Sequence, residues 1–421
     1  MNNQKVQSAY EVAKELYEDI KKDTEYICNN KDVEPIQMIN RDKFLAVERF
    51  EEMQLGKILQ ALYDLGHEHP SQVQKLAIPA IKSQNDVVIQ SQSGTGKTIA
   101  FLVGLLTSIE KGKGTQAVII SPTRELNMQI YDVTLKLTKY NEIETFLALK
   151  DKNFDKNHYE IILGTPGSVL SLVNRRLFDF KNLKFFVLDE TDVLLDKTTM
   201  GTQTFRLLQA FKTAKKVFIS ATYNDDIKKT IDAYAPDCVK LYQKQNAKPD
   251  EIKLYHIDVS YKDKVRTLQS LYELLTVGQV IVFVSKKATV KKLEKILVAD
   301  SNSVSILHGD LLPEERDFTV EKFKTADTKI LVTTDVFSRG MDIPQVNLII
   351  NFDLPYYEDK LLLETYIHRI GRSGRFGRTG FVIDMIGGGK EFKDYIQIQE
   401  ELKTISKGFT IEELQNVNVD E

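Results

Sequence analysis

Cysteine is scarce in this chain, which carries only two in 421 residues. With Cys28 and Cys238 alone, a disulfide framework or a zinc site is not expected, and a reducing compartment is the natural setting. No apolar stretch approaches the ~18 residues that a membrane helix needs, so we expect no membrane insertion. The first residues are polar and charged, and they lack the apolar core of a signal peptide.

Positive charge is not in surplus either. The 57 Lys and Arg residues are outnumbered by 60 Asp and Glu residues, and the formal net charge at pH 7 is −3. This balance argues against bulk attraction to nucleic acid, so any such binding has to come from a locally basic face. Hydrophobic residues at 42% and charged residues at 28% are typical of a globular protein, and the length allows two or three domains.

Short apolar runs alternate with helix-length segments along most of the chain. Because these runs are apolar at nearly every position, they indicate parallel strands covered by helices on both faces of a sheet. We therefore expect an α/β protein with two tandem domains, at residues 46–242 and 252–421, joined by the polar linker 243–251. The apolar runs lie at residues 87–89, 117–120, 146–149, 161–163, 185–188, 217–219 and 239–241, and then at 254–259, 280–284, 304–307, 330–332, 348–350 and 381–386.

The stretch from Asp86 to Thr98 predicts a phosphate-binding loop. An apolar strand is followed by a turn rich in Ser and Gly and then by a helix, so backbone N–H groups and a helix N-terminus would converge on an anion. Lys97 would supply a charge for the β- and γ-phosphates, and the Thr98 hydroxyl would ligate Mg²⁺. Ser91 stands where the strict pattern has Gly.

Two carboxylates follow the apolar run 185–188. Asp189 and Glu190 are therefore expected at the carboxyl end of a buried strand, which is where ligands sit in open α/β sheets. Asp189 is suited to hold Mg²⁺, and Glu190 is suited to orient or deprotonate an attacking water. An acidic loop that caps a helix is the alternative interpretation.

Hydroxyl and guanidinium groups elsewhere in the chain are further candidates for the site. Ser220 and Thr222 follow the run 217–219, and their hydroxyls could hydrogen-bond to the acidic pair, although a turn or a helix cap explains them as well. Residues 368–375 hold three arginines and one histidine. Arg372 and Arg375 are three positions apart, so on one helical turn they would share a face and could reach a γ-phosphate held by the first domain. A generic basic patch is the alternative for this segment.

Seven motifs follow one another within residues 50–386, namely Ser93–Thr98, Pro122–Leu126, Thr165–Gly167, Asp189–Asp192, Ser220–Thr222, Thr334–Asp335 with Arg339–Asp342, and His368–Arg375. In this order they resemble the motifs of the DEAD-box RNA helicases. The resemblance implies two RecA-like domains, each a largely parallel sheet with helices on both faces, and an ATP-dependent RNA helicase activity that uses ATP and Mg²⁺. Residues 305–311 and 351–355 look most like the mRNA-export branch that acts at the nuclear pore.

The same resemblance implies roles for single residues. Gln74 would read the adenine edge, Asp342 would lie near the ribose, and Arg372 and Arg375 would complete the ATP site across the cleft between the domains. Contacts to phosphate and 2′-hydroxyl groups would give a preference for RNA without sequence specificity. The loop residues implied for ATP are Ser93, Gly94, Thr95, Gly96, Lys97 and Thr98; those for RNA are Pro122, Arg124, Thr165, Gly167, His308, Gly309, Arg316 and Thr334; those for coupling are Ser220 and Thr222.

The chain departs from the family pattern at a few positions. Thr191 replaces the Ala that names the family, and His67 stands where an aromatic residue is usual. Residues 150–153 replace a Gly pair near RNA, and Pro313 occupies a Gln position before Arg316. The last two departures concern contacts with RNA rather than ATP chemistry.

Residues 1–45 form an expected N-terminal extension with a weakly amphipathic helical pattern. Two interpretations stay open for it. In the first, the helix is a solvated tail. In the second, its apolar residues pack into the open cleft between the domains and lower the basal ATPase activity, as the resemblance to export helicases implies. The apolar residues are Val12, Ala13, Leu16 and Ile20.

These observations together predict an ATP-dependent RNA helicase that unwinds or remodels short stretches of RNA and RNA–protein complexes in mRNA export. The expected partners are single-stranded or short duplex RNA, nuclear-pore export factors and an inositol phosphate-dependent activator. The protein would be a monomer in the cytoplasm and nucleus, at the cytoplasmic face of the pore. Two alternatives remain, namely an ATP-locked RNA clamp with low turnover and a translation-initiation type RNA-dependent ATPase.

Overall fold

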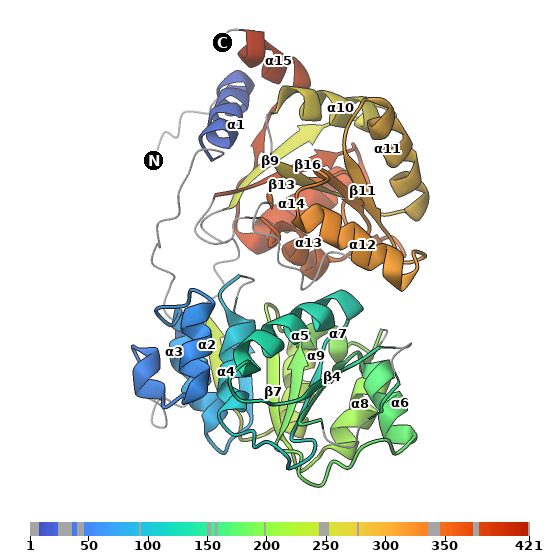
Figure 1. Cartoon of the computed structure of the whole chain (residues 1–421). Coiled ribbons are helices and arrows are strands. Elements are labelled where there is room, and N and C mark those ends of the chain that lie inside the picture. Colours follow the sequence, from blue (N-terminus) through green and yellow to red (C-terminus); the bar gives the residue numbers. More distant parts are fainter. Residues whose placement is uncertain are drawn as a thin grey trace. The chain divides into compact units, whose positions relative to one another are not determined.

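A computed structural model describes residues 8–23, 36–39, 46–91, 94–149, 153–155, 159–197, 199–243, 252–275, 278–335, 346–373 and 379–419 of the chain. The chain divides into two compact units (Figure 1). Residues 33–244 form the first unit, and residues 245–421 form the second unit together with residues 1–32. None of the helices within the described ranges is both long enough and apolar enough to cross a membrane.

The first unit is an α/β domain built on one sheet. Its strands are β1 (Ile36–Ile39), β2 (Val87–Gln90), β3 (Ala117–Ile120), β4 (Thr145–Ala148), β5 (Ile161–Gly164), β6 (Phe185–Asp189), β7 (Lys215–Ser220) and β8 (Val239–Gln243). They form an eight-stranded sheet in the order β1-β8-β2-β7-β6-β3-β5-β4, in which only the β1–β8 pair is antiparallel. The helices are the 3₁₀ turn η2 (Phe50–Met53), α2 (Lys57–Asp64), α3 (Gln72–Lys82), α4 (Lys97–Leu106), α5 (Arg124–Thr138), α6 (Pro166–Asn174), α7 (Thr191–Leu194), α8 (Gly201–Ala210) and α9 (Asp225–Tyr234).

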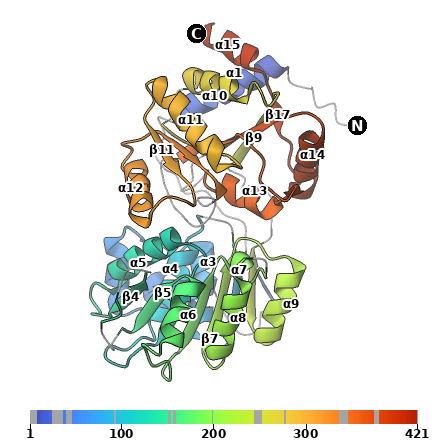
Figure 2. The same ribbon diagram turned by 90° about the vertical axis from the view of Figure 1, so that its right-hand side faces the viewer.

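The second unit repeats this architecture. Its strands are β9 (Ile252–Asp258), β10 (Gln279–Phe283), β11 (Val304–Leu307), β12 (Ile330–Thr333), β13 (Val346–Asn351), β14 (Tyr356–Tyr357), β15 (Lys360–Leu361), β16 (Gly380–Ile386) and β17 (Lys407–Gly408). Seven of them form a parallel sheet in the order β11-β12-β10-β13-β16-β9-β17, and β14 and β15 form a small hairpin. The helices are α1 (Ala9–Asp23), α10 (Lys264–Leu274), α11 (Lys287–Ala299), α12 (Pro313–Lys324), α13 (Leu363–Ile370), α14 (Lys390–Leu402) and α15 (Ile411–Val419), and they surround the sheet in Figure 2.

Each sheet has a hydrophobic core on both of its faces, which explains the continuous apolar runs. In β6, Phe185 and Val187 pack in the core that also contains helices α2 to α5. Phe186 and Leu188 pack on the opposite face with α6 and α8. Because neither face of the strand meets water, both sets of side chains are apolar. The predicted fold of two tandem parallel α/β domains is confirmed.

The N-terminal helix α1 differs from both interpretations that the sequence left open. Val12, Ala13, Leu16 and Ile20 are at most 4% exposed, and they belong to one core of the second unit. Their neighbours in that core include Tyr255 and Leu414, and α1 lies beside α15 (Figure 1). The helix is therefore neither a solvated tail nor free to present this apolar face elsewhere, because the face is already buried within the second unit.

Candidate active site

The loop between β2 and α4 has the backbone of an anion-binding turn. Gly94 and Gly96 have φ angles of +80° and +88°, in the left-handed region that favours glycine. Gly96 is the residue before the first turn of α4, so the N–H groups of that turn point out of the helix at the loop. Lys97 opens the helix, and its Nζ donates to the Ser91 carbonyl at 2.6 Å. Thr95 and Thr98, the other predicted ligands of this loop, are half-buried.

Gln74 is joined to this loop from the start of α3. Its Nε2 donates to the Gly96 carbonyl at 3.3 Å, and the Ser71 hydroxyl donates to the Thr95 carbonyl at 2.8 Å. Ser71 and Gln74 also form a capping box at the N-terminus of α3. A Cβ atom at Gly96 would lie 2.5 Å from Gln74 Nε2, so the close approach requires glycine. The amide that is predicted to read adenine is thus held against the phosphate loop.

The acidic pair lies at the carboxyl end of β6, two strands away from the loop in the sheet. Asp189 is 6% and Glu190 is 7% exposed. Burial and the neighbouring Glu190 carboxylate raise the pKa of Asp189 to about 7, and the Lys97 ammonium acts in the opposite direction. Glu190 itself has φ +55° and ψ +53°, an uncommon conformation for a non-glycine residue. Strained backbone of this kind costs on the order of 1–3 kcal/mol and is typical of functional sites.

Thr191, the departure from the family pattern, has a structural role. Its hydroxyl donates to the Leu188 carbonyl at 2.8 Å and accepts from the Ile219 N–H at 3.0 Å. The side chain is completely buried. It therefore links β6 to β7 just beyond the last residue of β6, where the strand turns away into α7.

Ser220 and Thr222 hydrogen-bond to a carboxylate of the acidic motif, although not to the pair itself. The Ser220 and Thr222 hydroxyls donate to the two oxygens of Asp192 at 2.9 and 3.0 Å. The Ser220 carbonyl in turn accepts from the Ser91 N–H at 3.2 Å. β7 lies between β2 and β6, so this chain of contacts connects the phosphate loop with the acidic motif.

The residues of the first unit that are implied for RNA lie on the same edge of the sheet. β3 and β5 are neighbours, and the Ser121 N–H donates to the Gly164 carbonyl at 3.3 Å where the two strands end. Pro122 and Arg124 follow β3, and Thr165 and Gly167 follow β5. Helices α5 and α6 start at this edge, so two helix N-termini present their N–H groups there, which favours phosphate.

The second unit gathers its implied RNA residues at the ends of β11 and β12. His308 follows β11 and is 2% exposed. The Arg316 guanidinium, from α12, donates to the Gly309 carbonyl at 2.5 Å. The Thr334 N–H donates to the Leu307 carbonyl at 3.3 Å, which brings the end of β12 to the end of β11. These residues, far apart in sequence, thus form one cluster.

The arginine motif differs from its expected geometry. Helix α13 ends at Ile370, and Gly371 follows as its C-cap, so Arg372 lies in a turn rather than on a helical face. Arg372 is 3% exposed, and its Nε donates to the His368 carbonyl at 3.1 Å. The expectation of one helical turn shared with Arg375 is wrong for Arg372, because α13 ends at Ile370, before this residue. Several predicted positions lie outside the described residues, namely Ser93, Asp342, Arg375 and residues 150–152; the Pro313 side chain does too.

Arg369 is a residue that the sequence interpretation missed. It is fully buried; its Nε donates to Asp335 at 2.6 Å and its Nη1 donates to the Asp353 carbonyl at 2.7 Å. Because Asp335 follows Thr334, this pair holds the end of β12 in place. Sequence alone placed Arg369 in a basic cluster. The sequence did carry one indication that Arg369 is buried. It lies in the same helix as Tyr366 and Ile370, whose side chains are also buried.

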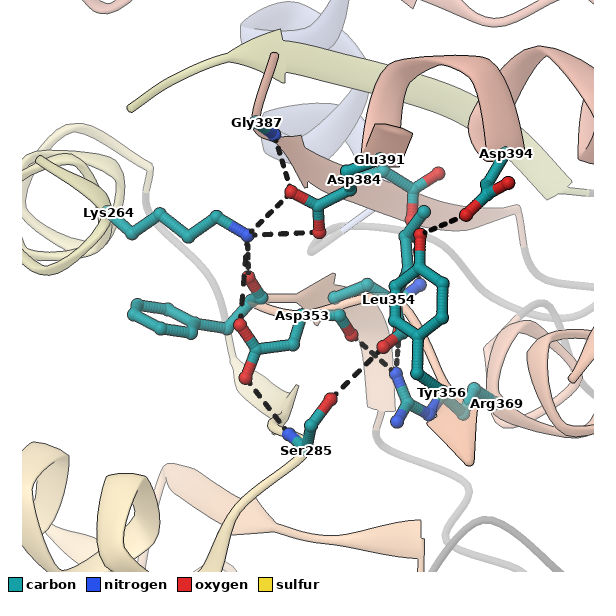
Figure 3. Close-up of polar contacts among 12 residues, drawn as sticks. Lys264, Ser285, Asp353, Leu354, Tyr356, Arg369, Asp384, Gly387, Glu391 and Asp394 are labelled. Carbon is teal, nitrogen blue, oxygen red and sulfur yellow. Dashed lines mark hydrogen bonds and ion pairs between the residues drawn. The ribbon is translucent and has the colours of Figure 1, made fainter. Parts of the chain in front are cut away.

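Lys264 is a second missed residue, and Figure 3 shows its surroundings. Its side chain is 1% exposed, and its Nζ donates to the Phe352 carbonyl at 2.7 Å. It also forms ion pairs with Glu391 at 3.3 Å and Asp353 at 3.7 Å. Lys264 thereby ties the start of α10 to the end of β13 and the first turn of α14, next to the buried Arg369.

The residues present fit a nucleotide with Mg²⁺. Asp189 and Thr98 offer oxygen ligands, which Mg²⁺ prefers. The raised pKa of Asp189 comes from burial beside another carboxylate, and a nearby cation would favour its charged form. The Lys97 ammonium lowers that pKa, and a divalent cation would add further positive charge beside the two adjacent carboxylates.

Comparisons with known proteins show which family the chain resembles in sequence and fold. Residues 71–230 match the family model of the DEAD/DEAH box helicases, and residues 263–377 match that of the helicase conserved C-terminal domain. The ATP-dependent RNA helicase dbp5 of Schizosaccharomyces pombe is 36% identical over 84% of this chain and 73% of that protein. The structure of Saccharomyces cerevisiae Dbp5 bound to RNA and ADP BeF3 covers 89% of this chain and 98% of its own, with 34% identity and a TM-score of 0.83. A second Dbp5 structure, bound to Nup159, Gle1, IP6 and ADP, covers 87% of this chain and 97% of its own, with 33% identity and a TM-score of 0.61.

Proposed function

We propose that this chain, which belongs to the DEAD-box family of ATP-dependent RNA helicases, hydrolyses ATP in response to RNA and separates or remodels short stretches of RNA. The observation that carries the proposal is the chain of contacts from the phosphate loop through β7 to the acidic motif. A loop built for phosphate, a buried carboxylate pair and two helix N-termini share one edge of the sheet. This arrangement suits an ATPase whose turnover depends on a second ligand.

The ATP-binding part uses residues of the first unit. Gly94, Thr95, Gly96 and Lys97 would hold the phosphates, and Thr98 and Asp189 would hold Mg²⁺, whose charge offsets that of the phosphates. Glu190 would orient and deprotonate the attacking water, because its backbone places a carboxylate directly after the proposed Mg²⁺ ligand. Gln74 would select adenine with the hydrogen-bonding capacity of its amide that Ser71 and Gly96 do not use.

RNA would be bound through its backbone. The edge formed by Pro122, Arg124, Thr165 and Gly167 offers a guanidinium and helix N-termini, and these groups recognise phosphate rather than base edges. In the second unit, His308, Gly309, Arg316 and Thr334 form the corresponding cluster. Binding of this kind is independent of sequence, and a 2′-hydroxyl contact would favour RNA over DNA.

Arg372 and Arg375 are the proposed arginines that stabilise charge on the transferred phosphate. An arginine in this role contributes on the order of 10³ to 10⁵ in rate. The Arg372 Nε donates to the His368 carbonyl at 3.1 Å, which holds the guanidinium at the end of α13. Asp342, near the ribose, would complete the set.

The cellular role that we propose is mRNA export at the cytoplasmic face of the nuclear pore. The Dbp5 structure with Nup159, Gle1 and IP6 supports this role, because this chain covers 97% of the solved Dbp5 chain at 33% identity. An activator that uses an inositol phosphate and a nuclear-pore docking partner are therefore the proposed partners besides RNA. Co-purification of the tagged protein with nuclear-pore components would test this part separately.

Steady-state ATPase measurements with and without single-stranded RNA test the main proposal. We expect RNA to raise the turnover number, and catalytic amounts of protein to separate a short duplex in the presence of ATP. An ATPase rate that RNA leaves unchanged would refute the proposal. Stable ATP-dependent retention of RNA without strand separation or release would favour the clamp instead.

A further inference from the structure

Helix α11 carries a concentrated basic surface in the second unit. The chain as a whole has a net charge of −3, so RNA binding requires a face on which positive charge is locally concentrated. Five lysines lie within ten positions at the start of this helix, against one acidic residue, Glu294, and all five lysines are exposed. They are Lys286, which is the N-cap, Lys287, Lys291, Lys292 and Lys295.

Three of these lysines form a row along one side of the helix. Lys287, Lys291 and Lys295 follow one another at intervals of four residues, which places their Cα atoms about 6 Å apart along the helix axis. This spacing is similar to that of successive phosphates along a single strand of nucleic acid. Leu293 and Leu297, on another side of the helix, pack in the core on one face of the sheet. The lysine row is therefore outside the packed face, and its ammonium groups are accessible.

The lysine row begins at the residues of the second unit that are proposed to bind RNA. α11 packs beside β11 and β12, whose ends carry that cluster (Figure 1). The Lys287 ammonium pairs with Asp310, and a Cβ atom at Gly309 would lie 3.9 Å from Lys287 Cε. The hydrogen bond from Lys287 lowers the pKa of Asp310 from its ordinary value, and the charge of Lys291 acts in the same direction. Lys291 is therefore within electrostatic reach of the cluster, and Lys295 lies about one helical turn further away.

Helix stability does not explain this order of charges. Because the N-terminal end of a helix dipole is positive, acidic residues are favourable in the first turn and basic residues in the last. α12 has this arrangement, with Glu314 and Glu315 in its first turn and Lys322 and Lys324 in its last. α11 has no acidic residue in its first turn and begins with Lys287, and lysines four positions apart repel each other. The lysine row therefore destabilises the helix on its own, and a bound anion would relieve this repulsion.

We propose, on the basis of the RNA-binding function proposed above, that the lysine row binds the phosphates of an RNA strand where it continues beyond the cluster at the ends of β11 and β12. Asp310 offsets the charge of Lys287, whereas Lys291 and Lys295 form no ion pair with the residues that the structure describes. Two ammonium groups therefore remain for the strand. They contact phosphates as point charges and do not read base edges, so binding along α11 is independent of sequence.

Equilibrium binding of oligouridylates to the whole chain, with a non-hydrolysable ATP analogue present, tests the lysine row. The RNAs would range from about 4 to about 20 nucleotides, so that the longest extend well past a single binding site. Affinities would be measured over a series of salt concentrations, because the slope of log K against log[salt] reports the number of phosphates contacted. The test variant is Lys291→Gln combined with Lys295→Gln, and the matched control is Lys393→Gln combined with Lys403→Gln.

For the longest RNA, we expect the affinity of the test variant to be at least roughly tenfold lower than that of the wild type at ~0.1 M salt. The slope of log K against log[salt] should become shallower by about 1.4, at ~0.7 for each lost contact with a single strand. The affinity of the test variant should also stop rising at a shorter RNA length, because the phosphates beyond the cluster have lost their partners. The shortest RNA should bind both proteins about equally.

The control variant removes the same charge from the opposite face of the same sheet. Lys393 lies on α14 and Lys403 is its C-cap, and both are exposed. α14 packs through Tyr395 and Ile398 in the core on the face of the sheet that α11 does not cover. The control should bind every RNA as the wild type does, and equal losses in the two double variants would reveal an effect of net charge alone and overturn the proposal.

The wild type distinguishes a failure of the lysine row from a failure of the proposed function. If the wild type binds RNA and the test variant has the same affinity, salt slope and length dependence, the lysine row faces another anion, such as an acidic protein, and the proposed function stands without it. If the wild type binds no RNA at any length, both are refuted. Thermal unfolding adds a check, because removal of like charges should leave the test variant at least as stable as the wild type. A less stable test variant would assign the two lysines to the fold and overturn their role in binding.

Discussion

The Thr191 hydroxyl accepts the backbone N–H of Ile219 at 3.0 Å, and it joins β6 to β7 at the last pair of their ladder, Asp189 and Ile219. The same hydroxyl donates to the Leu188 carbonyl at 2.8 Å. β6 has to turn sharply after Asp189 to present the acidic pair, so it cannot continue to pair with β7. The side-chain hydroxyl of Thr191, two positions after the last residue of β6, supplies an acceptor for the Ile219 N–H.

Thr191→Ala should therefore lower the stability of the first unit by about 1–3 kcal/mol, because it leaves the Ile219 N–H buried without this acceptor. The ATPase activity at low temperature should be nearly unchanged, since Thr191 is not assigned to the chemistry. Urea unfolding of the two variants measures the difference. Thr191→Ser keeps the hydroxyl and is the matched control; equal losses for Ala and Ser would show that the methyl group, and not the hydrogen bond, matters.

Gly96→Ala should weaken ATP binding by at least roughly tenfold, which corresponds to about 1.4 kcal/mol. The substitution is strained at φ +88°, and its Cβ would lie 2.5 Å from Gln74 Nε2, so both the loop and Gln74 must shift. Isothermal titration with a non-hydrolysable ATP analogue measures the effect. Gly112→Ala is the control, because it has φ +75° but nothing within 4 Å of its Cβ. Similar losses in both variants would mean that the contact with Gln74 is unimportant.

Glu190→Gln should lower the turnover number on the order of 10² to 10⁴-fold while ATP and RNA remain bound. The amide keeps the shape of the carboxylate but cannot accept the proton of the attacking water. Lys97→Ala, in contrast, should lose ATP binding as well as turnover, because it removes the charge at the phosphate loop. Single-turnover hydrolysis and fluorescent nucleotide binding separate the two effects; loss of nucleotide binding in Glu190→Gln would contradict the role given to this residue.

The sequence predicted those features of the molecule that depend only on residues close together in the chain. Runs such as Phe185 to Leu188 are apolar at every position because the strand is buried on both faces, and this pattern is visible without any partner. The position of Asp189 and Glu190 at a strand end followed from it. Phosphate-loop glycines are likewise local, since a positive φ is a property of single residues.

The missed features depend on partners that are distant in sequence. Glu15 and Lys407 are 392 positions apart, so no local pattern connects α1 with the second unit. Charged residues are expected at the surface. Lys264 and Arg369 are buried instead, because carbonyl and carboxylate groups distant in sequence accept their hydrogen bonds.

The buried carboxylate of Asp384 should make the stability of the second unit depend on pH. Asp384 accepts from Asn351 Nδ2 and from the Tyr366 hydroxyl, each at 2.7 Å, and burial raises its pKa from 3.8 to about 6. The folded form thus binds this proton more tightly than the unfolded form. Its contribution is fully present below pH 3.8 and is lost as the pH rises through 6, with a total of about 3 kcal/mol.

Asp384→Asn isolates this contribution, because the amide cannot titrate. The difference in unfolding free energy between wild type and variant, followed by urea denaturation of the whole chain from pH 4 to pH 7, should change by about 2 kcal/mol in favour of the variant as the pH rises. Other carboxylates titrate in both proteins and cancel in the difference. Asp300→Asn, at an exposed position, is the matched control for the exchange of a carboxylate for an amide. A pH-independent difference for Asp384→Asn would show that this carboxylate has an ordinary pKa in the folded protein, and that Asn351 and Tyr366 stabilise its charge enough to offset its burial.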